Sequence, residues 1–194
     1  MKVILETPRL ILRQFTQTDA PLILQLNSNA EIVKYLHEPI LKTAAAAQNI
    51  LTNIILPQYK NNFGRWAVHT KSGKEFIGWC GLKHRPELDE IDLGYRFMQQ
   101  FWGKGYATEA AQHTLLYGLS NLGLDIIIGR AHIENTASLK VLEKIGMQFV
   151  KEEMVDECPV KTYTATNPNK KFVKENKLSA KYFVNEIFLL LLTY

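Results

Sequence analysis

Hydrophobic and polar positions follow two periods along the chain, and their order predicts a mixed α/β protein. Alternating or continuous apolar runs predict strands at 10–15, 63–69, 76–82, 92–98 and 126–133, and a closing hairpin at 148–155 and 160–166. Steps of three and four residues predict helices at about 18–27, 43–59, 105–122 and 135–146. Because the third helix lies between two predicted strands, those strands are expected to form a parallel pair joined by a right-handed crossover.

Gly103, Lys104 and Gly105 stand at the start of this crossover helix. The first turn of a helix has N–H groups without intrahelical partners, and glycine lets an anion approach them. Together with the positive end of the helix dipole, this pattern predicts a site for phosphate oxygens. A tight glycine turn without a ligand is the alternative.

Two known phosphate-binding motifs do not fit the segment. The P-loop needs a glycine five residues before its Gly-Lys pair and a Ser or Thr after the lysine, but Met98 and Gly105 occupy these places. The dinucleotide fingerprint needs a third glycine where this chain has Thr108. Asp125, at about the right distance downstream, begins a hydrophobic run instead of ending one. The segment is therefore not predicted to be a nucleotide-binding loop of either kind.

The composition limits the class of protein. With 194 residues, 46% hydrophobic and 22% charged, the chain is expected to form one domain at 1–166, followed by an atypical tail at 167–194. The net charge of +4 is not gathered into basic runs, which argues against nucleic-acid binding. Two widely spaced cysteines fit the cytoplasm. The apolar end from Tyr182 is shorter than the roughly twenty residues of a membrane span, and no metal-like histidine spacing occurs.

Four passages of the chain resemble the GNAT superfamily of N-acetyltransferases, in the branch of the ribosomal-protein N-terminal acetyltransferases RimJ and RimL. The passages are 5–13, 77–82, 92–110 and 134–147, and the third contains Gln100-x-x-Gly103-x-Gly105. They follow the order of the family across most of residues 5–150. The resemblance implies the GNAT fold, an α/β (α+β) fold with a mixed, mostly antiparallel sheet of about six to seven strands, a splayed parallel central pair and flanking helices.

The resemblance also implies acetyl-CoA as cosubstrate. In such proteins the glycine segment wraps the pyrophosphate, a strand glycine marks a bulge that admits pantetheine, and backbone groups after it polarise the thioester. The strand glycine here is Gly94. The cofactor-binding residues are then expected to be Phe97, Met98, Gln100, Trp102, Gly103, Lys104, Gly105, Tyr106, Ala107 and Asn135. Helix capping alone would also explain Asn135, and Lys104 is either a phosphate contact or a solvated charge.

The chemistry needs a proton acceptor, because an alkyl ammonium with a pKa near ~10 is mostly protonated at neutral pH. Asp92 matches the acidic position of the family, and Glu90 shares its strand face as the second candidate. The alternative is that both are exposed strand-edge charges. Many members protonate the leaving thiolate with a tyrosine, but this chain has Leu142 there. Ser138 matches the serine of the RimJ/RimL pattern and is the candidate donor, or a small packing residue.

These residues predict an acetyl-CoA-dependent N-acetyltransferase that acts on a primary amine. The acceptor partner is either a protein N-terminus or a small amine, and its pocket is expected from 29–61 and the segment after Phe149. No nucleic acid, membrane span or metal is expected, and the protein is predicted to be a monomer or homodimer. A non-catalytic acyl-CoA-binding or sensing module is the alternative, because Leu142 and the tail depart from the family.

Overall fold

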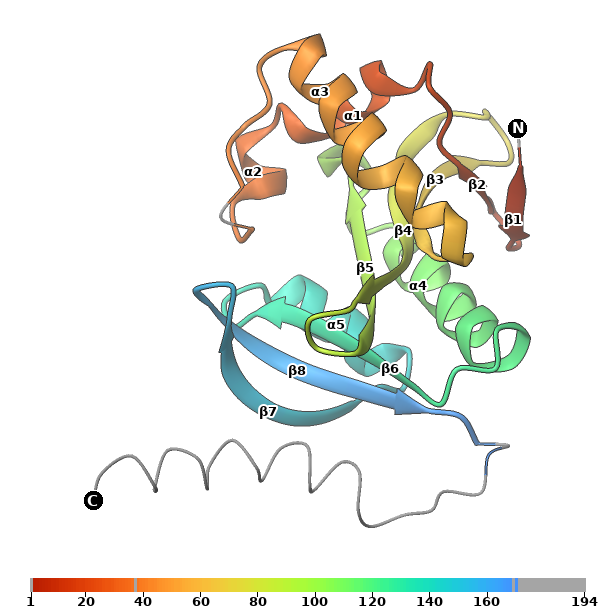
Figure 1. Cartoon of the computed structure of the whole chain (residues 1–194), viewed down its shortest axis with the longest axis vertical. Helices are drawn as coiled ribbons and strands as arrows, with labels where there is room; N and C mark the ends of the chain where they lie inside the picture. The colour runs from red at the N-terminus through yellow and green to blue at the C-terminus, as the bar shows by residue number, and fades with distance from the viewer. Residues whose placement is uncertain (1, 37, 169, 171–194) are drawn as a thin grey trace.

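A single mixed sheet of eight strands organises the protein (Figure 1). The computed structural model describes residues 2–36, 38–168 and 170. The sheet order is β1-β2-β3-β4-β5-β6-β8-β7, and only β5 and β6 are parallel. The strands are β1 Val3–Glu6, β2 Leu10–Gln14, β3 Gly64–Thr70, β4 Phe76–Arg85, β5 Glu90–Phe97, β6 Ile126–His132, β7 Gln148–Val155 and β8 Cys158–Thr166.

Five α-helices are described, and two of them continue in other helical forms. The bounds are α1 Ala20–Asn27, α2 Ala30–Val33, α3 Ala44–Ile50, α4 Tyr106–Leu116 and α5 Thr136–Lys144. A π turn and a 3₁₀ turn extend α3 to Asn61, and a π turn extends α4 to Asn121. The predicted order of elements is confirmed, but β1 and α2 were not predicted. Both have four residues, too short for a hydrophobic period to appear.

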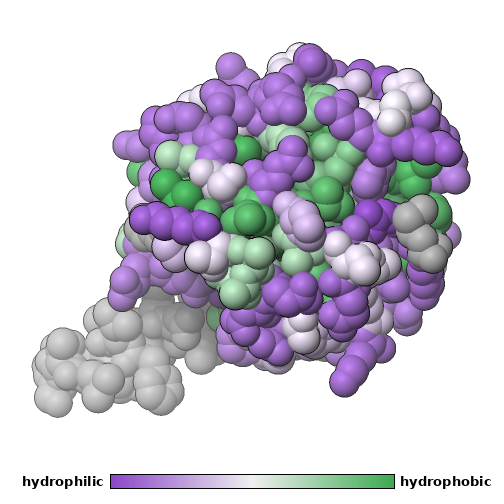
Figure 2. Space-filling model, turned by 90° about the horizontal axis from the view of Figure 1, so that it is seen from above, coloured by the Kyte–Doolittle hydropathy of each residue, from purple (hydrophilic) through white to green (hydrophobic). Residues whose placement is uncertain are grey.

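Helices cover both faces of the sheet. The larger core cluster joins Ala110, Ala111 and Leu115 of α4, and Leu139 and Leu142 of α5, to the inner strands. On the opposite face, α1 and α3 pack with Ala67 and Trp79 of the sheet. Viewed from the end that carries α1 and α3, the surface is mostly hydrophilic, with apolar residues in small patches (Figure 2). Among the described helices, none has the length and apolar character to cross a bilayer.

The parallel pair at the centre of the sheet separates after two residue pairs. Asp92 pairs with Ile128 and Leu93 with Gly129, and no further β5–β6 pair follows. Figure 1 shows β5 diverging from β6 and β8 beyond this point. The predicted splayed pair is therefore confirmed, and the open edge of β5 runs from Gly94 to Phe97.

The expected bulge at Gly94 is wrong. The β4–β5 register continues without a shift from Gly78 and Phe97 to Arg85 and Glu90. A Cβ added at Gly94 would instead lie 3.1 Å from the indole of Trp79. The Trp79 ring therefore covers the strand at Gly94 and leaves little room for a larger side chain there.

Candidate active site

The start of α4 offers unpaired N–H groups at an exposed turn. Gly103 and Gly105 have φ angles of 74° and 79°, in the left-handed region that favours glycine. Gly105 is the N-cap and supplies no side chain, and the first intrahelical bond runs from the Glu109 N–H to the Gly105 carbonyl at 3.0 Å. The three N–H groups of residues 106–108 thus remain available to an anion.

Arg9 fixes the geometry of this turn from the β1–β2 connection. Its Nη1 donates to the Lys104 carbonyl at 3.0 Å, and its Nε donates to Glu109 at 2.5 Å. Glu109 also accepts from the hydroxyl of Thr7 at 2.5 Å and the backbone N–H of Arg9 at 2.9 Å. Burial opposes ionisation of Glu109, but these hydrogen bonds outweigh it and lower the pKa of its carboxyl group. Sequence reasoning gave Arg9 no role, although it lies within the first resembling passage.

The remaining predicted cofactor residues of this segment form one continuous turn between β5 and α4. Gln100, Trp102 and Lys104 are exposed, whereas Tyr106 and Ala107 are half-buried. The indole N–H of Trp102 donates to the Phe97 carbonyl at 2.8 Å, so Trp102 shapes the turn through its side chain. Its backbone N–H already donates to the Gln99 carbonyl. The structure thus brings the predicted residues together and gives Trp102 a structural contact.

Backbone groups of β5 face the gap that β6 leaves. The Met98 N–H donates to the Ile77 carbonyl at 2.9 Å, which makes the Phe97–Gly78 pair a non-hydrogen-bonded pair of the antiparallel ladder. The N–H groups of Phe97 and Tyr95 consequently point away from β4, toward the open edge. Of these two amides, the Phe97 N–H is therefore directed toward the open edge, whereas the Met98 N–H already has a backbone partner. The cofactor contacts expected of both residues stay a prediction.

Asp92 lies where β5 and β6 begin to separate. The residue is half-buried, but its Oδ1 is fully buried and has no hydrogen-bond partner among the described residues. Burial raises the pKa of Asp92 to about 6, although the positive charges of Arg130, Arg85 and Lys83 act in the opposite direction. An unpartnered carboxylate oxygen with a pKa near neutrality has the properties of a general base.

Glu90 occupies a different environment from Asp92. Its carboxylate accepts from Arg130 Nη2 at 2.8 Å, and the two side chains are only 9% and 8% exposed. Arg130 also lies 3.5 Å from Glu153, while its Nη1 is buried without a partner among the described residues. Neither Glu90 nor Asp92 is therefore a solvated strand-edge charge. Arg130 was not identified from the sequence, because a cation within a strand carries no motif.

The first turn of α5 closes the far side of the gap. Asn135 caps the helix, since its Oδ1 accepts from the Ser138 N–H at 3.1 Å. Tyr95 of β5 reaches across, and its hydroxyl donates to the Ser138 carbonyl at 3.0 Å. Burial raises the pKa of the Tyr95 phenol, so this hydroxyl stays protonated at neutral pH. Leu142 is 1% exposed and lies 2.8 Å from where a Cβ of Gly129 would be, so it belongs to the core.

The face of the sheet opposite α4 and α5 is the side on which we expect the acceptor to bind, called the acceptor side below. The segment that follows α2 contacts both separating strands. Tyr35 stacks on His132 of β6 with 5.3 Å between the ring centres, and Glu38 forms an ion pair with Arg96 of β5 with 2.9 Å between nitrogen and oxygen. These contacts place part of the predicted 29–61 region beside the gap. No group of three or more His, Cys, Asp or Glu in the described part of the chain is placed to hold a metal ion.

Comparisons with known proteins agree with this geometry. A family model described as an acetyltransferase (GNAT) domain matches residues 9–148. An uncharacterised N-acetyltransferase of Bacillus subtilis (strain 168), YoaA, is 36% identical over 151 residues, which cover 75% of this chain and 82% of YoaA.

Two solved structures share the fold. RimL, a ribosomal L7/L12 α-N-protein acetyltransferase in complex with coenzyme A, has a TM-score of 0.75 at 16% identity, covering 87% of this chain and 100% of RimL. Spermidine N-acetyltransferase from Vibrio cholerae, with coenzyme A and spermine, has a TM-score of 0.69 at 20% identity, covering 81% and 95%. At these identities the RimJ/RimL branch stays a prediction. The family match and the sequence relatives show that the chain belongs to the GNAT family of acetyltransferases.

Proposed function

We propose that the protein transfers the acetyl group of acetyl-CoA directly to a primary amine, with Asp92 as general base. The observation that carries this proposal is the buried, unpartnered Oδ1 of Asp92 at the point where β5 and β6 separate. With a pKa of about 6, Asp92 is mostly a carboxylate at pH 7 and can take a proton from an ammonium, directly or through a water molecule.

The cofactor would bind along the open edge of β5. Its pyrophosphate would accept from the N–H groups at the start of α4, which Arg9 holds in place. The pantetheine arm would enter between β5 and β6, where Asn135 Nδ2 lies at the first turn of α5. The thioester oxygen would then face the Phe97 N–H. A donor fixed where an oxyanion develops is commonly the largest single contribution to catalysis.

The reaction would proceed by nucleophilic attack. The amine, after losing a proton to Asp92, would form a C–N bond with the thioester carbon, and the carbonyl electrons would move to the oxygen facing Phe97. Collapse of this intermediate would break the C–S bond and release the coenzyme A thiolate. The nitrogen, cationic after the attack, would lose its second proton. Ser138, at the first turn of α5, is proposed to donate its hydroxyl proton to the thiolate, directly or through water, and to take up the proton that the nitrogen releases. Tyr95 would position that turn.

Glu90 is the weaker candidate for the base. Its carboxylate is held by Arg130 at 2.8 Å, and a carboxylate in an ion pair is a poorer proton acceptor than one without a partner. The acceptor is proposed to be a protein N-terminus or a small amine. Both cysteines are free thiols, which supports the proposed cytoplasmic location.

Thiol release measures this function directly. The purified full chain is incubated with acetyl-CoA and a panel of peptides and small amines, and free thiol and acetylated product are followed together. We expect acceptor-dependent thiol release, matched by an equal amount of acetylated amine, and thermal stabilisation by acetyl-CoA. Stabilisation without turnover on any acceptor would refute the catalytic proposal, and no stabilisation would refute the cofactor site.

A further inference from the structure

The charged groups on the acceptor side are paired, with a few exceptions. Arg96 is held by Glu38 and Asn27. Arg130 is held by Glu90 and Glu153. Arg85 is held by Glu87 and Asp156. Asp92 has no hydrogen-bond partner at Oδ1. Among the described residues, the Arg65 guanidinium has no hydrogen bond or ion pair, and Lys83, opposite Asp92 in the register, has no ion pair.

Arg65 lies close to the open edge of β5. The register places Arg65 of β3, Gly81 of β4 and Gly94 of β5 in one row across the sheet, so no side chain of β4 or β5 stands in that row. The Trp79 indole covers Gly94, and the Arg65 guanidinium lies 5.1 Å from the centre of that indole. The guanidinium thus lies beside the indole that covers Gly94, on the same face of the sheet.

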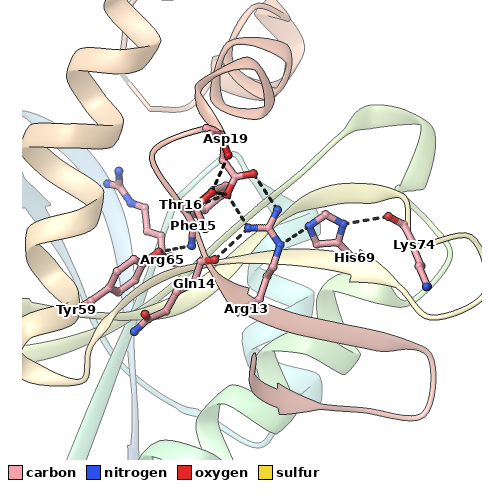
Figure 3. A network of polar contacts seen from close by, with 10 residues as sticks. Arg13, Gln14, Phe15, Thr16, Asp19, Tyr59, Arg65, His69 and Lys74 are labelled. Carbon is pink, nitrogen blue, oxygen red and sulfur yellow. Dashed lines mark hydrogen bonds and ion pairs between the residues drawn. The ribbon is translucent and has the colours of Figure 1, made fainter. Parts of the chain in front are cut away.

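The backbone at Arg65 is fixed, and its side chain is directed away from the nearest polar network. The Tyr59 hydroxyl donates to the Arg65 carbonyl at 2.6 Å and accepts from the Phe15 N–H at 2.9 Å. Figure 3 shows the Arg65 side chain lying apart from the Arg13–Asp19 ion pair and its neighbours. The structure therefore presents a positioned cation whose counterion does not come from this network.

The surroundings of Arg65 favour an anion. Burial, and after it the nearby charge of Arg96, lower the pKa of Arg65, although the charges of Glu38, Tyr59 and Asp92 act in the opposite direction. None of these acidic groups forms an ion pair with the guanidinium among the described residues. An arginine also stacks on aromatic rings while it binds a carboxylate or phosphate through its planar fork. Two strand spacings of about 4.8 Å separate the backbones of Arg65 and Gly94. An acceptor that reaches both sites therefore carries its anion several bonds from its amine.

We propose that the acceptor is an anionic amine, with its carboxylate or other anion bound by Arg65 over the Trp79 indole and its amine directed to Asp92. This inference rests on the proposed function, because it places the amine beside the predicted base. A free amino acid and an acidic peptide share the required chemistry. A polyamine lacks the anion that would pair with Arg65.

Matched pairs of acceptors test the inference. The pairs are ε-aminohexanoate and its amide, γ-aminobutyrate and its amide, and amidated Ala-Asp and Ala-Asn peptides, with spermidine as a polycation. We expect at least one acid to have a kcat/KM roughly 10- to 100-fold above that of its amide, the size of a lost charge-assisted hydrogen bond. The amino acid and peptide pairs distinguish the two sources of the anion. Equal values for acid and amide in every pair would overturn the inference.

Three variants assign the effect to Arg65. Arg65→Gln should reduce the acid-to-amide ratio to about one, and Arg65→Lys should leave an intermediate ratio because it keeps the charge without the fork. Lys83→Gln is the matched control and should keep the ratio. If Lys83→Gln removes the ratio and Arg65→Gln does not, the assignment to Arg65 is wrong. Unchanged thermal stabilisation by acetyl-CoA verifies that each variant folds.

A binding measurement separates this inference from the proposed function. Calorimetry on the complex with coenzyme A compares each acid with its amide without requiring turnover. Preferential binding of an acid that depends on Arg65, in the absence of any acetylation, would support the anion site and refute the acetyltransferase proposal. Acetylation of amines with no preference for the acid in either assay would support the acetyltransferase proposal and refute the anion site.

Discussion

Replacing Asp92 by asparagine should make the protein more stable and less active at the same time. The substitution keeps the shape of the side chain and removes a carboxylate that is buried without a hydrogen-bond partner at Oδ1. Because burial raises the pKa from 3.8 to about 6, the folded state binds a proton more tightly than the unfolded state. Between about pH 4 and pH 6 the stability of the wild type therefore falls as the pH rises.

The difference in pKa sets the size of this effect. A shift from 3.8 to about 6 corresponds to about 3 kcal/mol at pH 7, at 1.36 kcal/mol for each pKa unit, and this is an upper estimate. We expect Asp92→Asn to raise the free energy of unfolding at pH 7 by about 1 to 3 kcal/mol, and to have little effect at pH 4. The rate at pH 7 should fall by about 10²-fold or more, the usual contribution of a general base.

Urea unfolding at pH 4 and pH 7 and a pH–rate profile measure the two effects. The wild-type kcat/KM should decline below about pH 6, and this limb should vanish in the variant. The difference in rate should shrink as the pH approaches the pKa of the amine, near ~10, because the free amine needs no base. Asp89→Asn, an exposed acid in the preceding turn, is the control. A variant that is neither more stable nor slower at pH 7 would refute the role of Asp92.

Three further changes test the scaffold of the site. Gly105→Ala places a Cβ at a φ of 79°, about 1–2 kcal/mol of strain, and should weaken acetyl-CoA binding in calorimetry, whereas Gly123→Ala, at a φ of 65°, should cost stability alone. Glu109→Gln should weaken cofactor binding and lower stability above pH 4.5, and the loss of stability should shrink as the pH falls below 4.5, because the folded pKa of Glu109 is lowered. Tyr95→Phe should lower the unfolding free energy by about 1 kcal/mol and reduce kcat more than it changes acetyl-CoA affinity. Equal effects of the two glycine substitutions on cofactor binding would contradict the first of these.

The sheet and its helices were predictable because their signals are local. Each strand predicted from hydrophobic periodicity has a counterpart in the structure. The strand–helix–strand order also predicted the parallel pair of β5 and β6. The strand β1 was missed because it has four residues and pairs along one edge only, with a shift between Val3 and Leu5. The reason for Gly94 was misjudged because its neighbour, the Trp79 indole, lies on another strand.

The two halves of the candidate site also differ in how far their residues lie apart in the sequence. The proposed phosphate end is built from backbone N–H groups and two left-handed glycines, all within the short segment 103–108. The acceptor side depends on side chains from separate elements, such as Arg65, Arg96 and Glu38, whose meeting depends on the register. The sequence also could not distinguish the Phe97 amide from the Met98 amide, because the alternation of paired and open N–H groups is set by the partner strand.

The ion pairs around Asp92 bear on its proposed role as a base. Arg130 is the strongest of the charges that lower its pKa, but Glu90 binds Arg130 at 2.8 Å and itself raises the pKa of Asp92. We therefore expect Glu90 to act as a positioning residue, whose ion pair with Arg130 limits the effect of that cation on Asp92. Glu90→Gln should free Arg130 to pair with Asp92 and shift the acid limb of the kcat/KM profile down by roughly one pH unit, with a lower rate at pH 7 because the carboxylate becomes a weaker base. Glu152→Gln, on the exposed pair with Lys161, is the matched control. An unshifted limb in Glu90→Gln would show that Glu90 does not set the basicity of Asp92.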